Sequence, residues 1–205
     1  MIILACNTSS AKALRTIQQK DLKRLGPDKR VLGVIRPSTE IIGKLTKTGK
    51  VGILATPGTV SSMSYVIEVA HFSPEVTVYQ QACPIWVPLI ESNKYDTEAG
   101  LKFIKEDIEN LLAMNPDMDV IVLGCTHYPF LRPIMKEILP DHISIIDSGE
   151  AVAKYTKNVL EKMEREGNDS NAPSHAFYTN GDIAVLQSFV KAINVDIGIS
   201  KKMEF

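Results

Sequence analysis

A cysteine directly follows a short apolar run near the start of the chain, where its thiol could take part in proton transfer. The run at residues 2–5 ends at Cys6, and Asn7 and Thr8 come next. A free thiol ionises near ~8.5, and a helix N-terminus or a cationic neighbour lowers that pKa. Because a helix is predicted after Thr8, Cys6 could exchange protons near neutral pH. Asn7 and Thr8 could donate hydrogen bonds to a carboxylate, or could simply cap the helix.

A second cysteine repeats this pattern further along the chain. The run at residues 120–123 is followed, after one glycine, by Cys125, and His127 lies two residues beyond it. His127 could donate a proton or orient the thiol, or could be a structural histidine. Free cysteines are most often buried as small hydrophobic residues, and Cys83 is interpreted in that way. The polar neighbours of Cys6 and Cys125 favour a chemical role for these two thiols.

The apolar runs alternate with helical patterns, which indicates an α/β fold. Several runs are continuous in β-branched residues, as strands of a parallel sheet are when helices cover both faces. Both thiols would then lie at carboxyl ends of strands, where ligands bind in open α/β sheets. Strands are predicted at 2–5, 31–35, 51–55, 76–78, 120–123 and 143–146, helices at 97–114, 152–163 and 183–193, an exposed loop at 164–173 and a loose tail at 201–205.

Composition and missing motifs exclude several classes of function. Hydrophobic residues make up 44% of the chain and charged residues 23%, as in an ordinary soluble globular protein. The net charge of -1 predicts neither a nucleic-acid nor a membrane partner. Three scattered cysteines fit a reducing cytoplasm better than a disulfide framework. No Gly-x-Gly, His-Glu-x-x-His or Cys-x-x-Cys pattern predicts a dinucleotide cofactor or a metal, so a small-molecule substrate is the expected partner.

Around the two cysteines, the sequence resembles the glutamate racemases. Residues 4–8 are similar to the Ala-Cys-Asn-Thr motif of that family, and residues 122–129 match its Gly-Cys-Thr-His-Tyr-Pro motif almost letter for letter. The resemblance covers essentially the whole chain. Further matches occur, in the family's order, at residues 51–56, 58–60, 82–91, 147–151 and 177–179.

The resemblance implies a fold, a reaction and a cellular role. The fold would be two similar α/β domains with mainly parallel sheets covered by helices, residues 1–33 plus 147–205 and residues 34–146, with the substrate between them. The reaction would be the cofactor-independent interconversion of L- and D-glutamate, an isomerisation that uses two thiols as bases. D-glutamate would supply peptidoglycan for the cell wall and cell shape, in the cytoplasm. A homodimer is compatible with the sequence.

Each site residue is assigned through its match to a family motif. One thiolate would remove the α-proton of glutamate, and the other thiol would deliver a proton to the opposite face. The resemblance implies that Cys6 and Cys125 are this base–acid pair, that His127 assists Cys125, that Glu91 is an acid near the site, and that Asn7, Thr8, Thr126 and His127 bind the substrate.

The chain departs from the family pattern in two respects. An earlier segment with Asp-Ser-Gly and Pro-Tyr-Gly motifs, about two strand–helix units or ~60 residues, has no counterpart before Met1. We therefore expect an incomplete first domain, an exposed edge at residues 2–5, and weak or no turnover. Within the match, Arg36 stands where the family usually has Glu, and residues 61–65 depart from its Ser-Gly-Ala-Tyr sequence.

Two alternative functions stay open on this basis. The first is a truncated, non-catalytic homologue that binds a dicarboxylate or a protein partner. The second is a sister enzyme, such as an aspartate racemase or a decarboxylase with one proton-donating cysteine. The Gly-Cys-Thr-His-Tyr-Pro sequence at residues 124–129 favours glutamate over these alternatives.

Overall fold

The computed structural model describes residues 1–26, 29–163, 175–192 and 199–203. It divides into two compact units, Met1–Met163 and Glu164–Phe205. The loop expected at residues 164–173 lies outside the described residues. Among the helices of the described part, none is both long and apolar enough to cross a lipid bilayer.

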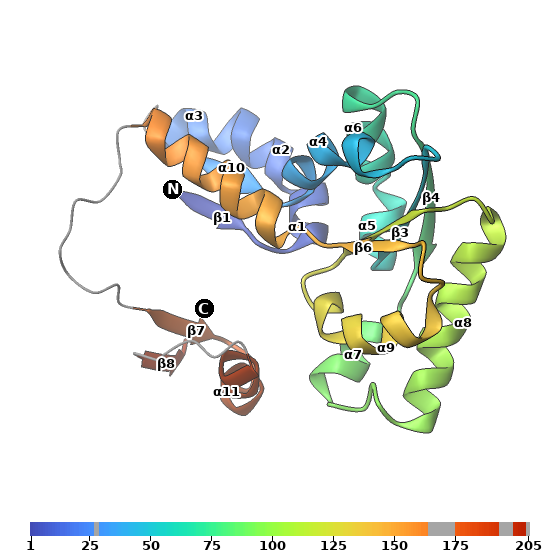
Figure 1. Cartoon of the computed structure of the whole chain (residues 1–205). Coiled ribbons are helices and arrows are strands. Elements are labelled where there is room, and N and C mark those ends of the chain that lie inside the picture. Colours follow the sequence, from blue (N-terminus) through green and yellow to red (C-terminus); the bar gives the residue numbers. More distant parts are fainter. Residues whose placement is uncertain (27–28, 164–174, 193–198, 204–205) are drawn as a thin grey trace. The chain divides into compact units, whose positions relative to one another are not determined.

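The larger sheet of the first unit has four parallel strands in the order β4-β3-β5-β6 (Figure 1). β3 (Lys50–Ala55) and β5 (Val120–Gly124) form its buried centre, with Ala55 opposite Gly124 in the register. β4 (Thr77–Ala82) and β6 (Ser144–Ile146) lie at the two edges. The expectation of a parallel α/β sheet with nearly continuous apolar strands is confirmed.

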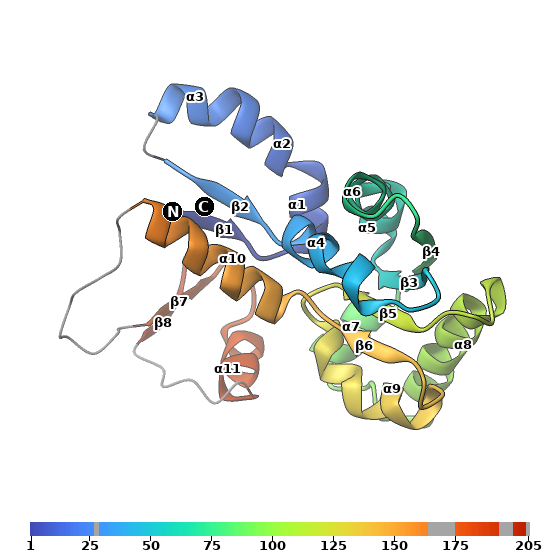
Figure 2. The ribbon, with the colours of Figure 1, turned by 45° about the horizontal axis from the view of Figure 1, so that its top comes forward.

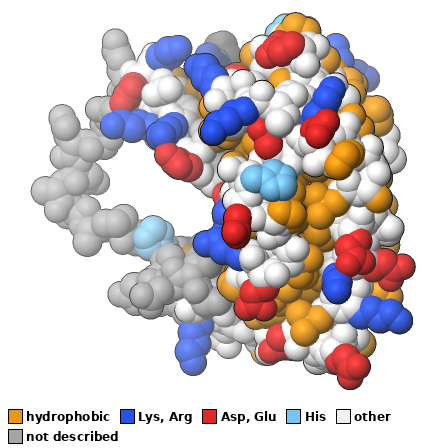
Figure 3. Space-filling model, turned by 45° about the vertical axis from the view of Figure 1, so that its right-hand side comes forward, with side chains coloured by type: hydrophobic (Ala, Val, Ile, Leu, Met, Phe, Trp, Pro, Cys, Tyr) orange, Lys and Arg blue, Asp and Glu red, His pale blue; other side chains and the backbone are white. Residues whose placement is uncertain are grey.

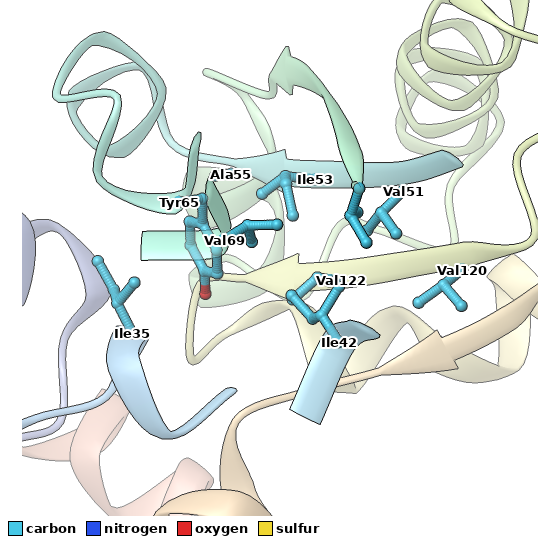
Figure 4. Close-up of a cluster of buried hydrophobic side chains, with 10 residues drawn as sticks. Ile35, Ile42, Val51, Ile53, Ala55, Tyr65, Val69, Val120 and Val122 are labelled. Atoms are coloured by element: carbon cyan, nitrogen blue, oxygen red, sulfur yellow. The ribbon is translucent and has the colours of Figure 1, made fainter. Parts of the chain in front are cut away.

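Helices cover both faces of this sheet, because neighbouring residues of a strand point to opposite sides. On one face, α4 (Ile35–Leu45) and α6 (Ser64–Phe72) pack their apolar side chains against β3 and β5 in the cluster of Figure 4. On the other face lies α8 (Glu98–Met114). Gly52 leaves room there, since a Cβ at this position would come within 2.4 Å of the Met118 sulfur.

A second, smaller sheet in the first unit contains β1 (Ile2–Leu4) and β2 (Val31–Gly33), which are parallel. Among the described residues β1 pairs only with β2, and the side chain of Ile2 is 60% exposed, as expected for an exposed edge. Between the strands run α1 (Asn7–Lys12), α2 (Leu14–Thr16), the π-helix η1 (Ile17–Asp21) and α3 (Leu22–Leu25), and α10 (Gly149–Lys162) is the last helix of the unit (Figure 2).

The predicted helices agree closely with the structure. The helix expected at residues 97–114 is α8, which begins after Thr97, whose side chain accepts a hydrogen bond from the Gly100 backbone N–H. The helices expected at 152–163 and 183–193 are α10 and α11 (Ile183–Ala192). Six helical elements were not predicted: α4, α6, α5 (Pro57–Ser61), α7 (Trp86–Glu91), the 3₁₀-helix η2 (Tyr128–Leu131) and α9 (Arg132–Ile138).

Three predicted boundaries are wrong. The run at 31–35 is not all strand, because Ile35 begins α4; a short buried apolar run has the same pattern in a strand and in a helix. β4 continues to Ala82, since pairing with β3 satisfies its backbone whatever the side chains are. The expected tail at 201–205 contains part of β8 (Ile199–Lys202), which pairs in parallel with β7 (Ala176–Thr179) in the second unit.

Charged side chains of both signs are interspersed on the face shown in Figure 3, around a band of exposed hydrophobic side chains. This distribution agrees with the net charge of -1.

Met63, between α5 and α6, has a left-handed backbone with φ 55° and ψ 13°. This conformation costs ~1–2 kcal/mol for a residue with a Cβ, whereas glycine adopts it freely. The Met63 side chain is 46% exposed, so its removal loses little burial. We expect Met63→Gly to raise the free energy of unfolding by ~1 kcal/mol in urea titrations.

Met63→Ala is the matched control, because it shortens the side chain but keeps the Cβ. Its free energy of unfolding should not rise above that of the parent. If the alanine and glycine variants raise the free energy of unfolding equally, backbone strain at Met63 is not the cause of the increase.

Candidate active site

Polar residues follow three strands of the first unit at their carboxyl ends. Cys6 comes two residues after β1, Thr56 directly after β3, and Cys125 directly after β5. β3 and β5 are neighbours in one sheet, so Thr56 and Cys125 emerge side by side from the same edge. Carboxyl ends of parallel strands are where open α/β sheets bind ligands.

Cys6 is an exposed thiol whose surroundings favour its ionised form. It is the N-cap residue of α1, and its carbonyl accepts a hydrogen bond from the Ser10 backbone N–H at 2.9 Å. Partial burial is the largest single influence and opposes ionisation, but hydrogen bonds from Ser9 and Thr8 together outweigh it. The pKa of Cys6 is therefore below its ordinary value of 9.0.

Cys125 has the opposite tendency. Its side chain is buried, and burial is the main reason why the pKa of Cys125 lies above its ordinary value of 9.0. A backbone hydrogen bond from His127 opposes this shift, and the negative charge of an ionised Cys6 adds to it. Because the two thiols interact electrostatically, ionisation of one disfavours ionisation of the other. The arrangement favours one thiolate, at Cys6, and one thiol, at Cys125.

His127 connects Cys125 to an acidic residue from another part of the chain. Its Nε2 lies 3.1 Å from Glu91 Oε1, at the end of α7, and its Nδ1 lies 3.9 Å from Cys125 Sγ. A carboxylate can only accept a hydrogen bond, so Nε2 carries a proton, and Nδ1 is the ring nitrogen that faces the thiol. The Glu91 side chain is 48% exposed, which leaves the pair partly open to water.

A buried hydrogen bond links the segment after β1 to the larger sheet. The Tyr65 hydroxyl, on α6, donates to Asn7 Oδ1 at 2.9 Å, and both side chains are almost fully buried. Figure 4 shows the Tyr65 ring in the apolar cluster near the end of β5, with its oxygen at the rim. The Asn7 Nδ2 is buried and has no hydrogen-bond partner among the described residues. Asn7 does not cap α1, because that position belongs to Cys6.

Three threonine hydroxyls form a second link, between the segment after β1 and the residues that follow β3. Thr8 Oγ1 lies 2.8 Å from Thr56 Oγ1 and 3.1 Å from Thr59 Oγ1, and Thr56 lies 3.1 Å from Thr59. Gly58 allows this close approach, since a Cβ there would come within 2.9 Å of the Thr8 methyl group. The triangle holds α1 against the N-terminus of α5.

The remaining residues considered from the sequence differ in burial. Thr126 is exposed in the turn between Cys125 and His127. Cys83, interpreted as structural, is buried with its thiol directed to the Gln81 carbonyl at 3.7 Å, and burial raises the pKa of Cys83 far above its usual range. Among the residues that the structure describes, no three His, Cys, Asp or Glu side chains gather as a metal site would require.

Sequence reasoning did not single out Thr56, Thr59 or Tyr65 as site residues. A signal for Thr56 was present, because it follows an apolar strand and a small residue, as Cys6 and Cys125 do. Thr59 then follows one turn later on α5. Tyr65 carries no comparable signal, since an aromatic residue in a helix usually indicates core packing.

Comparisons with known proteins find chains of similar sequence. Residues 1–156 match the Asp/Glu/hydantoin racemase family. A glutamate racemase from Enterococcus faecalis is 33% identical over 194 residues, which is 94% of this chain and 68% of that protein. The chain spans about two thirds of the length of the curated relatives that it matches.

Solved structures of glutamate racemases have a similar fold. An isoform from Bacillus anthracis superimposes with a TM-score of 0.87 at 28% identity, covering 99% of this chain and 73% of that one. The Escherichia coli enzyme, solved with L-glutamate and the activator UDP-MurNAc-Ala, gives a TM-score of 0.75 at 26% identity, covering 98% and 73%. The chain therefore belongs to the Asp/Glu/hydantoin racemase family and, within it, to the glutamate racemases, which are isomerases.

Proposed function

We propose that this protein interconverts L- and D-glutamate without a cofactor, with Cys6 and Cys125 as the two bases. The observation that carries the proposal is the opposite shift of the two thiol pKa values at interacting positions. A racemase must remove a proton from one face of a carbon and add one to the other face. That task needs one basic and one acidic group at the same time, and two thiols of unequal acidity that repel each other as thiolates favour this singly protonated state.

The protons balance in each turnover. The Cys6 thiolate takes the α-proton of glutamate and becomes a thiol, and the C–H electron pair remains on the substrate as a carbanion. The Cys125 thiol gives its proton to the opposite face of that carbon and becomes the thiolate. The net charge of the site is unchanged, and the reverse reaction begins from the Cys125 thiolate.

His127 and Glu91 make Cys125 able to take both roles. Glu91 holds the proton on His127 Nε2, so Nδ1 can receive the thiol proton of Cys125 when the thiolate is needed. The resulting imidazolium would be stabilised by the Glu91 carboxylate. The backbone hydrogen bond from His127 offsets part of the burial that disfavours the Cys125 thiolate, whereas the negative charge of Glu91 adds to the rise in the pKa of Cys125.

We propose that Asn7, Thr8 and Thr126 donate hydrogen bonds to the substrate carboxylates. Such donors stabilise the negative charge that spreads onto the α-carboxylate when the α-proton leaves. Support for glutamate as the substrate comes from the relatives, including the E. coli enzyme solved with L-glutamate.

A cellular role and a domain division follow as further proposals. D-glutamate from this reaction would supply peptidoglycan, and a reducing cytoplasm would keep both thiols free. The substrate would lie between one domain of residues 1–33 plus 147–205 and another of residues 34–146.

The direct test is the decay of circular dichroism of L- and of D-glutamate, with aspartate as a competing substrate. The parent should racemise both glutamate enantiomers at a weak but measurable rate, and in D₂O the product should carry deuterium at the α-carbon. Cys6→Ala and Cys125→Ala should each lose ~10²–10⁴-fold in rate.

Cys83→Ala is the matched control and should keep the parent rate, because the Cys83 thiol is buried and directed to the Gln81 carbonyl. A folded parent that turns over neither amino acid, or turns over only aspartate, refutes the proposal. Equal activity in all three alanine variants would refute the two-thiol mechanism.

The pH dependence of kcat/KM should be bell-shaped. Activity requires the Cys6 thiolate, so it should be lost as the pH falls through the lowered pKa of Cys6, below 9.0. It also requires the Cys125 thiol, so it should be lost as the pH rises through the raised pKa of Cys125, above 9.0. Ser9→Ala removes one hydrogen bond to the Cys6 thiolate and should move the acid limb to higher pH. An acid limb that does not move would show that Cys6 is not the group titrating there.

Thiol alkylation tests the same asymmetry without substrate. In the folded parent at pH 8, iodoacetamide should modify Cys6 at least ~10-fold faster than Cys125 or Cys83, because Cys6 is exposed and has the lowest thiol pKa. Peptide mass spectrometry gives the three rates. In a urea-unfolded control the three alkylation rates should be similar. Equal rates in the native chain as well would contradict the difference in pKa between Cys6 and the other two thiols.

A further inference from the structure

Tyr65 has one polar group, and the structure uses it at the site. Its side chain is fully buried among apolar residues of α4, α6 and the larger sheet, including Ile53 and Val69. Its hydroxyl reaches out of this cluster to Asn7 Oδ1, which is 58 residues away in sequence. Burial of a tyrosine hydroxyl without a partner is costly, so this contact determines where the Asn7 amide oxygen lies.

An amide has an acceptor and a donor on opposite sides, so fixing one side fixes the other. With Oδ1 on the Tyr65 hydroxyl, the Asn7 Nδ2 is left as a buried donor that no described residue accepts from. An unpaired buried donor costs ~1–3 kcal/mol, and a ligand that brings an acceptor removes that cost. Asn7 directly follows Cys6, so this acceptor would belong to a group next to the reacting carbon.

We propose that Tyr65 is a positioning residue, which holds the Asn7 amide so that its Nδ2 faces the substrate as a donor to a carboxylate oxygen. The inference rests on the proposed function and deepens it, because it explains how the site recognises an anionic acceptor instead of an ammonium group. Without the Tyr65 hydroxyl, the Asn7 amide could rotate so that its oxygen faces the substrate carboxylate. The amide oxygen and the carboxylate would then repel each other.

The surroundings keep Tyr65 in this role throughout the reaction. Gly124, just before Cys125, gives the ring its place, since a Cβ there would come within 3.2 Å of Tyr65 Cε2. Burial, and then the negative charge of an ionised Cys125, raise the pKa of Tyr65 far above its usual range. The hydroxyl therefore keeps its proton and stays a donor while the thiols exchange theirs.

A double-mutant cycle with Tyr65→Phe and Asn7→Ala tests the proposal. Tyr65→Phe keeps the ring in the core and removes only the hydroxyl. In the unliganded chain, the hydrogen bond should appear as a coupling of about fivefold in the unfolding equilibrium constant. No coupling would overturn the proposal, whatever the activity of the chain.

Binding and turnover of glutamate provide the second arm. Tyr65→Phe should weaken D-glutamate binding ~10-fold and raise KM more than it lowers kcat. In the Asn7→Ala background it should have no further effect, because Tyr65 acts through Asn7. Independent, multiplying effects in the two variants would overturn the proposal.

Two further variants separate positioning from general damage. Asn7→Asp keeps an acceptor for Tyr65 but replaces the donor by a carboxylate oxygen, so it should keep the Tyr65 hydrogen bond and lose glutamate binding. Tyr79→Phe removes a hydroxyl that accepts from Asn115 Nδ2 on another part of the sheet, and it should leave both binding and activity unchanged. An Asn7→Asp chain that binds glutamate as the parent does would contradict the donor role. If the parent itself binds no glutamate, the proposed function fails, and the unfolding cycle still decides whether Tyr65 holds Asn7.

Discussion

The site depends on a small set of buried hydrogen bonds between two sheets that share no strand. Tyr65 bonds Asn7, and Thr8 bonds Thr56 and Thr59, so the segment after β1 is held against the ends of β3 and β5. These polar groups are wholly or partly buried, and leaving them unpaired would be costly. Their pairing therefore specifies one relative position of the two sheets. Apolar contacts are non-directional, so by themselves they would allow several relative positions.

These hydrogen bonds position the two thiols and so determine the chemistry available to them. Cys6 lies in a partly open segment with hydrogen bonds from Ser9 and Thr8, whereas Cys125 lies at the buried end of a central strand. Different burial gives the same functional group two different acidities. Their mutual repulsion as thiolates sharpens the difference, so Cys6 ionises before Cys125 does. A proton relay between two faces of one carbon needs one basic and one acidic group at the same time.

Much of the fold could be predicted because its signals are short-range. The apolar runs at β3 and β5 and the helical spacing of α8 need only neighbouring residues to be recognised. The errors came where that signal is ambiguous: residues 34 and 35 have the apolar pattern of a strand but lead into α4, and β8 pairs a polar segment that no periodicity marks. The division into domains at residues 33, 34, 146 and 147 stays a prediction.

The sequence by itself determined the chemical groups: two thiols after apolar runs, each followed by polar residues, in an α/β chain with the motifs of a racemase family. Only the tertiary structure decided their partners and acidities. Glu91 meets His127 across 36 residues, and Tyr65 meets Asn7 across 58, because helices and crossovers bring distant strand ends together. Local patterns carry no information about such pairings, and burial, which raises the pKa of Cys125, exists only once the sheet and its helices have packed.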